Sequence, residues 1–233
     1  MRRFKVMENT GKPAAPTIGD HFPKVSVHTT LGPRMLPEDY SGKWLVLFSH
    51  PGDFTPVCTT EFIAFEQWKE HFDKINTELI GLSVDQVYSH LKWIEWIKDR
   101  IGIEITFPVI ADPLGELAAL LGMIRPNKST RPVRGVFVLD DKGIIRQVLY
   151  YPQEIGRNIS EIWRSVNALQ TASKHHVATP ENWPQNNIIG SDVIIPPASS
   201  VNDINQRYAQ QKEGQIQCFD WWFCHKPLVP QDT

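Results

Sequence analysis

Apolar stretches of strand length recur through the first half of the chain. Residues 44–49, 79–84 and 106–111 are mainly apolar runs of about six residues, the length and composition of strands buried in a sheet. Residues 24–29 form a weaker strand candidate, and the Leu31-Gly32-Pro33 segment that follows is typical of a turn. The pattern therefore predicts four strands before residue 112.

Between these strands, apolar residues recur every three or four positions, which is the period of an amphipathic helix. The clearest case lies in residues 62–72 and predicts a helix from near Cys58 to about Asn76. Further helices are predicted over residues 89–100, 115–121 and 158–173.

A hairpin is predicted further along the chain. Asp140-Asp141-Lys142-Gly143 separates two apolar runs, residues 136–139 and 144–150. From residue 44 onward the order of elements is then β–α–β–α–β–α–β–β–α. Such an alternation predicts an α/β fold, a mixed sheet flanked by helices on both faces.

The chain changes character after about His175. Residues 180–187 are rich in turn formers, residues 194–200 are interrupted by prolines, and a helix over 203–212 is possible. Four aromatic residues then fall within residues 219–223. Because exposing such a group to water is unfavourable, we expect this segment to pack on the core or on a second subunit.

These changes divide the chain into three parts. Residues 1–18 contain Gly11, Pro13 and Pro16 and are interpreted as an N-terminal arm. Residues 19–174 form the predicted α/β domain. Residues 175–233 form a C-terminal extension.

Composition excludes several classes of protein. The chain is 41% hydrophobic and 21% charged, as soluble globular proteins are, and its net charge of −2 gives no reason to expect nucleic-acid binding. No apolar run approaches the roughly 20 residues that span a bilayer. The basic N-terminus is not followed by the apolar core of a secretory signal. Three cysteines are too few for a disulfide scaffold, which indicates a reducing compartment, and we expect a cytoplasmic protein.

Cys58 is the candidate for chemistry. It lies where the predicted strand 44–49 passes through a proline-containing turn into the predicted helix. A helix N-terminus presents unpaired N–H groups and the positive end of the helix dipole, and both favour a thiolate, the nucleophilic form of cysteine. The layout is that of a thioredoxin-like fold. An inert buried cysteine is the alternative, but the polar turn before it favours a reactive thiol.

Residues 50–61 closely resemble the active-site loop of peroxiredoxins. The family's motif is Pro, three residues, Thr or Ser, two residues and Cys, and here it reads Pro51, Thr55 and Cys58. Residues 134–140 resemble the strand that carries the family's catalytic arginine, and residues 155–158 resemble its second arginine site. The resemblance covers about residues 18 to 226. It is strongest to the 1-Cys-like branch, and within it to archaeal and bacterial members with two extra cysteines.

The resemblance implies a thiol-dependent peroxidase that reduces hydrogen peroxide and organic hydroperoxides. Cys58 would attack the peroxide and become a sulfenic acid. Arg134 and Thr55 would bind the peroxide, with Arg134 also favouring the thiolate. Pro51 would shield the sulfur from water and His50 would line the pocket. The resemblance places Arg157 behind these residues, while from its sequence context alone it could equally be a helix-capping or ion-pairing residue.

Cys224 and Cys218 are the candidates for regenerating Cys58. The resemblance favours Cys224 as the resolving thiol, possibly from a partner subunit, and Cys218 could exchange with it. An external dithiol such as thioredoxin would then reduce the disulfide. The resemblance also implies homodimers that can build decamers. If neither cysteine reaches Cys58, a small or protein thiol would reduce it directly.

No cofactor or metal is expected. His175 and His176 are adjacent, so on a helix they point in different directions and are interpreted as part of a solvated face. Cys218 and Cys224 do not have the spacing of a structural zinc knuckle.

Other functions remain open on the sequence. One is an oligomeric holdase in which the redox site only switches assembly. A disulfide oxidoreductase is disfavoured because Thr59, Thr60 and Glu61 follow Cys58 where that class has Cys-x-x-Cys. A lipase activity, as in some 1-Cys-like relatives, is disfavoured because Gly81-Leu82-Ser83-Val84-Asp85 lacks the final glycine of G-x-S-x-G.

Overall fold

A computed structural model of the protein describes residues 14–124 and 129–228. Its contacts divide the chain into two compact units, one up to Ile159 and one from Ser160, and each is described by itself. This division falls at the start of helix α4 (Ile159–His175), whereas the sequence pattern places its boundary after residue 174. Most of the expected N-terminal arm lies outside the described residues.

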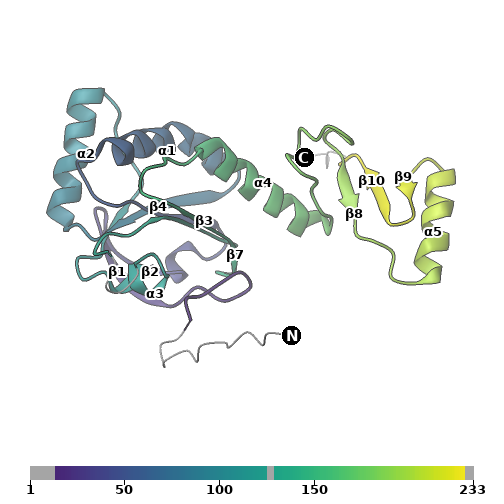
Figure 1. Cartoon of the computed structure of the whole chain (residues 1–233), viewed down its shortest axis with the longest axis horizontal. Helices are drawn as coiled ribbons and strands as arrows, with labels where there is room; N and C mark the ends of the chain where they lie inside the picture. The colour runs from purple at the N-terminus through teal and green to yellow at the C-terminus, as the bar shows by residue number, and fades with distance from the viewer. Residues whose placement is uncertain (1–13, 125–128, 229–233) are drawn as a thin grey trace, which may run out of the picture. The chain divides into compact units, whose positions relative to one another are not determined.

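The first unit is built on a seven-stranded mixed sheet with strand order β2-β1-β5-β4-β3-β6-β7. Its chain runs from purple through teal in Figure 1. Strand β3 is central, parallel to β4 and antiparallel to β6. The mixed sheet predicted from the sequence is confirmed. The strands are β1 (Val25–Thr29), β2 (Gly32–Leu36), β3 (Trp44–Ser49), β4 (Thr77–Ser83), β5 (Val109–Ala111), β6 (Arg134–Leu139) and β7 (Ile145–Tyr151).

The α-helices of this unit lie close to their predicted positions, whereas its short 3-10 helix was not predicted. The helices are the short 3-10 helix (Glu38–Tyr40), α1 (Pro56–Lys74), α2 (Val87–Ile101) and α3 (Glu116–Leu120). None of the helices described in either unit is long and apolar enough to cross a membrane.

Two local predictions are wrong. The strand expected over residues 106–111 begins only at Val109, after Pro108. The segment Leu31-Gly32-Pro33 is not a turn throughout, because strand β2 already begins at Gly32. The turn is confined to Thr30 and Leu31. The Thr29 hydroxyl closes it by donating to the Gly32 carbonyl at 2.6 Å and accepting from the Leu31 N–H at 3.1 Å. Gly32 permits so tight a return because its φ is +90°, which side chains disfavour.

Strand β3 contributes side chains to both faces of the sheet, as the alternation of a strand requires. Leu45 and Leu47 belong to a core cluster that also contains Leu117 and Ala118 of α3. Phe48, of opposite parity, stacks on Phe65 of α1 with ring centroids 3.7 Å apart. Helices therefore cover both faces, and α1 is fixed against the centre of the sheet.

The second unit contains α4, helix α5 (Val201–Lys212) and a three-stranded antiparallel sheet of order β8-β10-β9. Its strands are β8 (Val193–Ile195), β9 (Gln217–Asp220) and β10 (Phe223–Lys226). Trp183 is buried with Ala168 and Val193, and its indole N–H donates to the Ser191 carbonyl at 2.9 Å. The unit therefore has a small core of its own.

Candidate active site

Cys58 lies in the first turn of α1. Strand β3 ends at Ser49, residues 50–55 form the connecting turn, and α1 begins at Pro56. A proline suits the first helical position because it has no N–H to leave unpaired. Cys58 is a free thiol and is completely buried. The predicted placement of this thiol at a helix start is confirmed. The first N–H groups of a helix have no partner within the helix.

Arg134, the first residue of β6, lies against Cys58. Its Nη1 is 3.4 Å from the Cys58 Sγ and donates to Glu61 Oε2 at 2.6 Å. Its Nε and Nη2 donate to the carbonyl oxygen of Gln153 at 3.1 and 2.7 Å. The antiparallel pairing of β6 with β3 produces this contact, since it brings the start of β6 to the end of β3. The guanidinium is thus held in one orientation by three hydrogen bonds to groups other than the sulfur.

Glu61 joins two buried arginines. Besides Arg134, its carboxylate accepts from Arg157 Nε at 2.8 Å, Arg157 Nη2 at 2.9 Å and the Arg157 backbone N–H at 2.8 Å. Burial alone would raise the pKa of Glu61, but the hydrogen bonds and charges of Arg157 and Arg134 outweigh it and lower that pKa. One carboxylate therefore faces two guanidiniums, and one positive charge remains uncompensated beside the sulfur.

Within the described residues, Arg157 is linked to Cys58 through Glu61 and Arg134. Its Nη1 donates to the Gly135 carbonyl at 2.8 Å, and its guanidinium lies over the rings of Phe48 and Phe65 at 5.5 and 5.6 Å. It holds Glu61, and Glu61 in turn holds Arg134.

Sequence reasoning missed Glu61 as a site residue. Its spacing offered a signal, because a residue three positions after Cys58 lies on the same face of α1. A buried acid on the face of a nucleophile calls for cationic partners, and Arg134 and Arg157 are those partners.

Thr55 is the N-cap residue of α1. Its hydroxyl donates to the Gly52 carbonyl at 2.8 Å, and its own carbonyl accepts from the N–H and the hydroxyl of Thr59. The preceding residue, Phe54, has φ of +54°, an uncommon value for a residue with a side chain. Pro51 is buried in the same turn. The turn is therefore tightly folded, and its strained residue lies immediately before Thr55.

A cavity of about 540 Å³ borders this turn. Pro51, Thr55 and Arg131 are among the residues that line it, together with the apolar side chains of Val84 and Leu114. Two residues that the resemblance assigns to the site, Pro51 and Thr55, thus adjoin a cavity.

His50 lies in a different environment from the one expected for a pocket residue. It is completely buried, and its Nε2 is 2.8 Å from Asp53 Oδ1. Its ring packs against Phe62 and Trp93, with centroids 4.7 and 5.2 Å away. Burial lowers the pKa of His50. The described residues give it no hydrogen bond to Cys58, Thr55 or Arg134.

Two further polar residues, Asp53 and His90, join His50 in a buried cluster. Both Asp53 oxygens lie within hydrogen-bond distance of His90 Nδ1, at 3.0 and 2.8 Å. The ligand atoms of the three residues lie within 4.8 Å of one another, which makes them the one candidate metal-binding group in the described part of the chain. Sequence reasoning missed Asp53 and His90, which are 37 residues apart.

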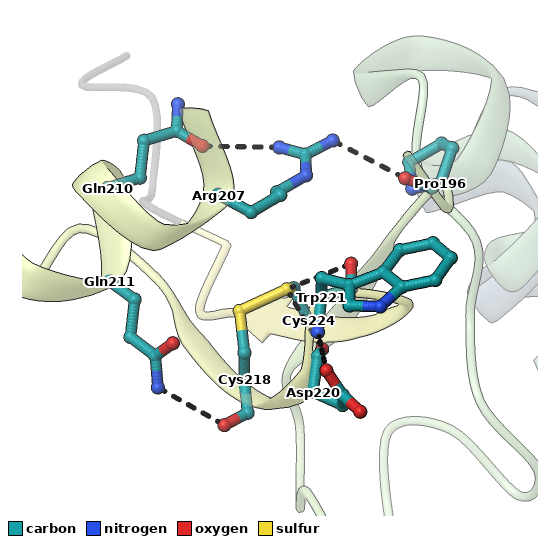
Figure 2. The surroundings of a disulfide bond; sticks show 8 residues. All are labelled: Pro196, Arg207, Gln210, Gln211, Cys218, Asp220, Trp221 and Cys224. Atoms are coloured by element: carbon teal, nitrogen blue, oxygen red, sulfur yellow. Dashed lines mark hydrogen bonds between the residues drawn. A yellow bond between two sulfur atoms is a disulfide. The ribbon is translucent and has the colours of Figure 1, made fainter. Parts of the chain in front are cut away.

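Cys218 and Cys224 form a disulfide between the paired strands β9 and β10 (Figure 2). The sulfur atoms are 2.12 Å apart. Cys224 is buried with Ile195 and Ile216, whereas Cys218 is partly exposed. Gln211 of α5 donates to the Cys218 carbonyl at 3.3 Å, which ties the helix to the hairpin. The hairpin aromatics Phe219 and Trp222 both contact Phe223, with ring centroids 5.0 and 5.7 Å away, but remain 63% and 55% exposed.

The fold and the surroundings of Cys58 together indicate the class of enzyme. A cysteine at the start of the helix that follows a central strand, on a mixed sheet with helices on both faces, is the arrangement of a thiol-based enzyme with a thioredoxin-like fold. The Arg134 guanidinium lies against that sulfur, and a cation beside a cysteine is typical of reactive thiol sites.

Comparison with known proteins identifies the family. Residues 18–148 match the AhpC/TSA family, and residues 168–211 match the C-terminal domain of 1-Cys peroxiredoxin. A Thermotoga maritima peroxiredoxin is 59% identical over 213 residues, covering 91% of this chain and 98% of that protein. A Methanocaldococcus jannaschii peroxiredoxin is 60% identical over 215 residues, covering 91% and 99%. The chain belongs to the peroxiredoxin family.

Solved structures agree. A cysteine-to-serine mutant of the peroxiredoxin 6 of Arenicola marina superimposes with a TM-score of 0.81 at 31% identity, covering 93% of this chain and all of that one. A yeast mitochondrial 1-Cys peroxiredoxin, described with a thiol resolving mechanism via glutathione and thioredoxin systems, gives 0.78 at 40% identity, covering 91% and 99%. The protein is therefore a thiol peroxidase with a thioredoxin-like fold, as the sequence predicted.

Proposed function

We propose that Cys58 is the peroxidatic cysteine and that Arg134 and Thr55 hold the peroxide. The observation that carries this proposal is the 3.4 Å contact between Arg134 Nη1 and Cys58 Sγ at the start of α1. The excess positive charge of the Arg134–Glu61–Arg157 network favours a thiolate, since opposite charges attract strongly in a buried site.

In the reaction, the thiolate attacks one oxygen of the hydroperoxide and the O–O bond breaks. The sulfur becomes a sulfenic acid, and the leaving oxygen takes a proton to become water or an alcohol. The guanidinium of Arg134 stabilises the negative charge that develops on the leaving oxygen. Arg157 positions this guanidinium through Glu61.

The turn supplies the remaining contacts. The Thr55 hydroxyl, now donating to Gly52, is placed to exchange that bond for one to the peroxide. Pro51 excludes water from the sulfur. His50 would enter the pocket through Nδ1, its one ring atom without a partner among the described residues. The apolar side chains of Val84, Leu114 and Ile124 in the mixed lining of the neighbouring cavity support organic hydroperoxides as substrates beside hydrogen peroxide.

Cys224 is the proposed resolving thiol, with Cys218 the alternative. Attack of the resolving thiolate on the Cys58 sulfenic acid forms a disulfide and releases water. Exchange with the other C-terminal cysteine then produces the Cys218–Cys224 disulfide, returns Cys58 to the thiol and leaves a partly exposed sulfur for an external dithiol. The glutathione and thioredoxin systems described for the yeast relative support a dithiol of the thioredoxin type.

We further propose a cytoplasmic homodimer, with decamers as the larger assembly. The small number of cysteines supports a reducing compartment. The exposed Phe219 and Trp222 of the extension, residues 175–233, support a role in contacts with a partner subunit.

Replacement of the proposed nucleophile tests the function. We expect Cys58→Ser to abolish the clearing of hydrogen peroxide at substoichiometric protein with a dithiol reductant, because a serine hydroxyl is not ionised at neutral pH. Cys218→Ser is the control for loss of a cysteine elsewhere and should retain the first, rapid turnover. Peroxide clearance that survives in Cys58→Ser would contradict the assignment, and a wild type that clears none would favour the holdase alternative.

The resolving cysteine is tested on non-reducing gels. We expect peroxide to convert fully reduced wild-type protein into a disulfide form that involves Cys58, and we expect Cys224→Ser to lose that form. The matched variant Cys218→Ser should keep it. If Cys224→Ser still forms the Cys58 disulfide, the resolving role belongs to Cys218.

A further inference from the structure

A buried polar cluster lies behind the active-site turn. His50 and Asp53 belong to the turn between β3 and α1, and His90 belongs to α2. His50 and His90 are completely buried, and Asp53 is nearly so. A cluster of three titratable side chains this deep requires a defined set of protons, because a mispaired polar group there is costly.

The surroundings of His90 fix its protonation. Its Nδ1 is 2.8 Å from Asp53 Oδ2, and its Nε2 is 3.2 Å from the Ile110 carbonyl oxygen. Carboxylates and carbonyls only accept hydrogen bonds, so both ring nitrogens must donate. A neutral imidazole has one N–H, whereas the imidazolium has two. The geometry therefore requires His90 to be a cation.

Asp53 is the counter-ion. Burial alone would raise the pKa of Asp53, but the hydrogen bonds from His50 and His90 and the charge of His90 hold it far below its ordinary range. The carboxylate also accepts from His50, whose Nε2 is 2.8 Å from Oδ1. Asp53 thus carries one negative charge against one imidazolium and receives N–H groups from two rings.

His50 is consequently the neutral ring. Its Nε2 must carry the proton, because it faces a carboxylate. Its Nδ1 is then an acceptor lone pair, buried and without a partner among the described residues. The acceptor is fixed in direction because Asp53 holds the opposite edge of the ring.

A metal ion is the competing occupant, since His50, Asp53 and His90 together resemble a ligand set. Ligand atoms about 2.0–2.2 Å from a tetrahedral zinc ion lie about 3.4 Å apart. Here the nitrogen–oxygen separations are 2.8 Å, which is the distance of hydrogen bonds. Protons account for these contacts and a metal ion does not.

The same cluster anchors the turn that leads into α1. The Asp53 backbone N–H donates to Asp85 Oδ2 at 2.9 Å, and that oxygen also accepts from the Ser83 hydroxyl. Trp93 of α2 donates through Nε1 to the Thr59 hydroxyl at 3.3 Å. Asp85 is the other charged side chain that contacts this part of the turn, through its bond to the Asp53 backbone.

We propose that a buried Asp53 carboxylate–His90 imidazolium pair locks His50 as the Nε2-protonated neutral tautomer, which makes Asp53 and His90 positioning residues for the peroxidatic turn. This inference rests on the proposed function of Cys58. In this tautomer His50 Nδ1 is always a hydrogen-bond acceptor. Its direction is fixed by Asp53 and His90, which lie outside the peroxide site.

Nitrogen NMR of the histidine rings in full-length, 15N-labelled protein tests the protonation states. Near neutral pH we expect both nitrogens of His90 to be protonated, because each faces an acceptor oxygen. We expect His50 to carry a proton on Nε2 alone. A neutral His90, or zinc that copurifies at one equivalent and shifts both rings, would overturn the proposal.

Kinetics test the positioning role. We expect Asp53→Asn and His90→Gln each to slow the oxidation of Cys58 by hydrogen peroxide about tenfold or more, because the turn and the His50 ring lose their fixed orientation. Both variants should also lose the single-tautomer NMR signature of His50. The control Asp73→Asn replaces an exposed aspartate paired with Lys69 and should leave both readouts unchanged.

Two variants are used in case one of them does not fold. His90→Gln is the milder change, because it preserves the Asp53 carboxylate and a hydrogen-bond donor. A folded variant that loses the His50 tautomer but reacts within about twofold of wild type would overturn the positioning role. The NMR result does not depend on turnover, so a failure of the Cys58 assignment remains distinguishable from a failure of this inference.

Discussion

At the scale of single residues, the charge around Cys58 depends on Glu61. It accepts from Arg134 and Arg157 at once and is almost completely buried. The motif around Cys58 contains Thr55, whereas Arg134 and Arg157 were expected from two further segments that resemble the family. The structure brings both arginines to Glu61 and Arg134 to Cys58. Glu61 was not predicted, since its role depends on two arginines that reach it only in the folded sheet.

This network predicts a dependence of stability on pH. The pKa of Glu61 is lowered in the folded protein, so as the pH falls the unfolded chain binds this proton first. The stabilisation is therefore complete above the ordinary pKa of a glutamate, about 4.3, and is lost as the pH falls through the lower folded pKa. We expect the free energy of unfolding of the wild type to fall more steeply below about pH 4.5 than that of Glu61→Gln.

Denaturant unfolding across this pH range measures the difference. At neutral pH, Glu61→Gln should be less stable by about 3 kcal/mol, because two buried guanidiniums lose their counter-charge. The pKa of Asp53 is also lowered, so the free energy of unfolding still falls with decreasing pH in both proteins. The exposed Glu70→Gln serves as control and should follow the wild type. Parallel pH profiles for wild type and Glu61→Gln would contradict the account.

Strand β6 is the element that brings the site together. It carries Arg134 and places Gly135 against β3, where the Gly135 N–H donates to Ser49 Oγ at 2.8 Å. The strand itself was predicted over residues 136–139 from its apolar run. The close approach of Gly135 to Ser49 and Met123 could not be predicted, because an apolar pattern indicates burial but does not indicate which residues are neighbours.

Gly135→Ala tests this close approach. A Cβ at this position would lie 2.9 Å from Met123 Cε and 3.2 Å from Ser49 Oγ. The Met123 side chain can move, but the Ser49 contact requires a shift of β6, and we expect a loss of about 1–3 kcal/mol in the free energy of unfolding. Gly156→Ala is the matched control, since its nearest neighbour, Val57 Cγ1, would be at an ordinary 3.4 Å. Equal stability of the two variants would show that β6 has room.

The C-terminal hairpin is an element that the sequence pattern did not predict. Strands β9 and β10 have four residues each, and Phe219 and Trp222 stay exposed. Short strands with outward aromatics do not give the alternation that identifies a half-buried strand. The sequence therefore indicated that residues 218–225 were unusual, but not that they form a hairpin closed by Cys218 and Cys224.

At the scale of the whole molecule, the free thiol and the disulfide belong to different units. Cys58 lies in the unit up to Ile159, and the Cys218–Cys224 disulfide lies in the unit from Ser160. A catalytic cycle that uses all three must pass oxidation from the first unit to the second, within one chain or between subunits. The family resemblance indicates Cys224 and Cys218 as the proposed partners of Cys58, whereas their order of reaction is a property of the assembled protein.

The most direct test follows all three cysteines by mass spectrometry after one equivalent of hydrogen peroxide is added to fully reduced protein. We predict that trapping at the earliest times finds the sulfenic acid on Cys58 alone, that a disulfide between Cys58 and Cys224 follows, and that the Cys218–Cys224 disulfide accumulates last. Oxidation of Cys218 or Cys224 while Cys58 remains a thiol would contradict the central claim that Cys58, held against Arg134, is the residue that meets the peroxide.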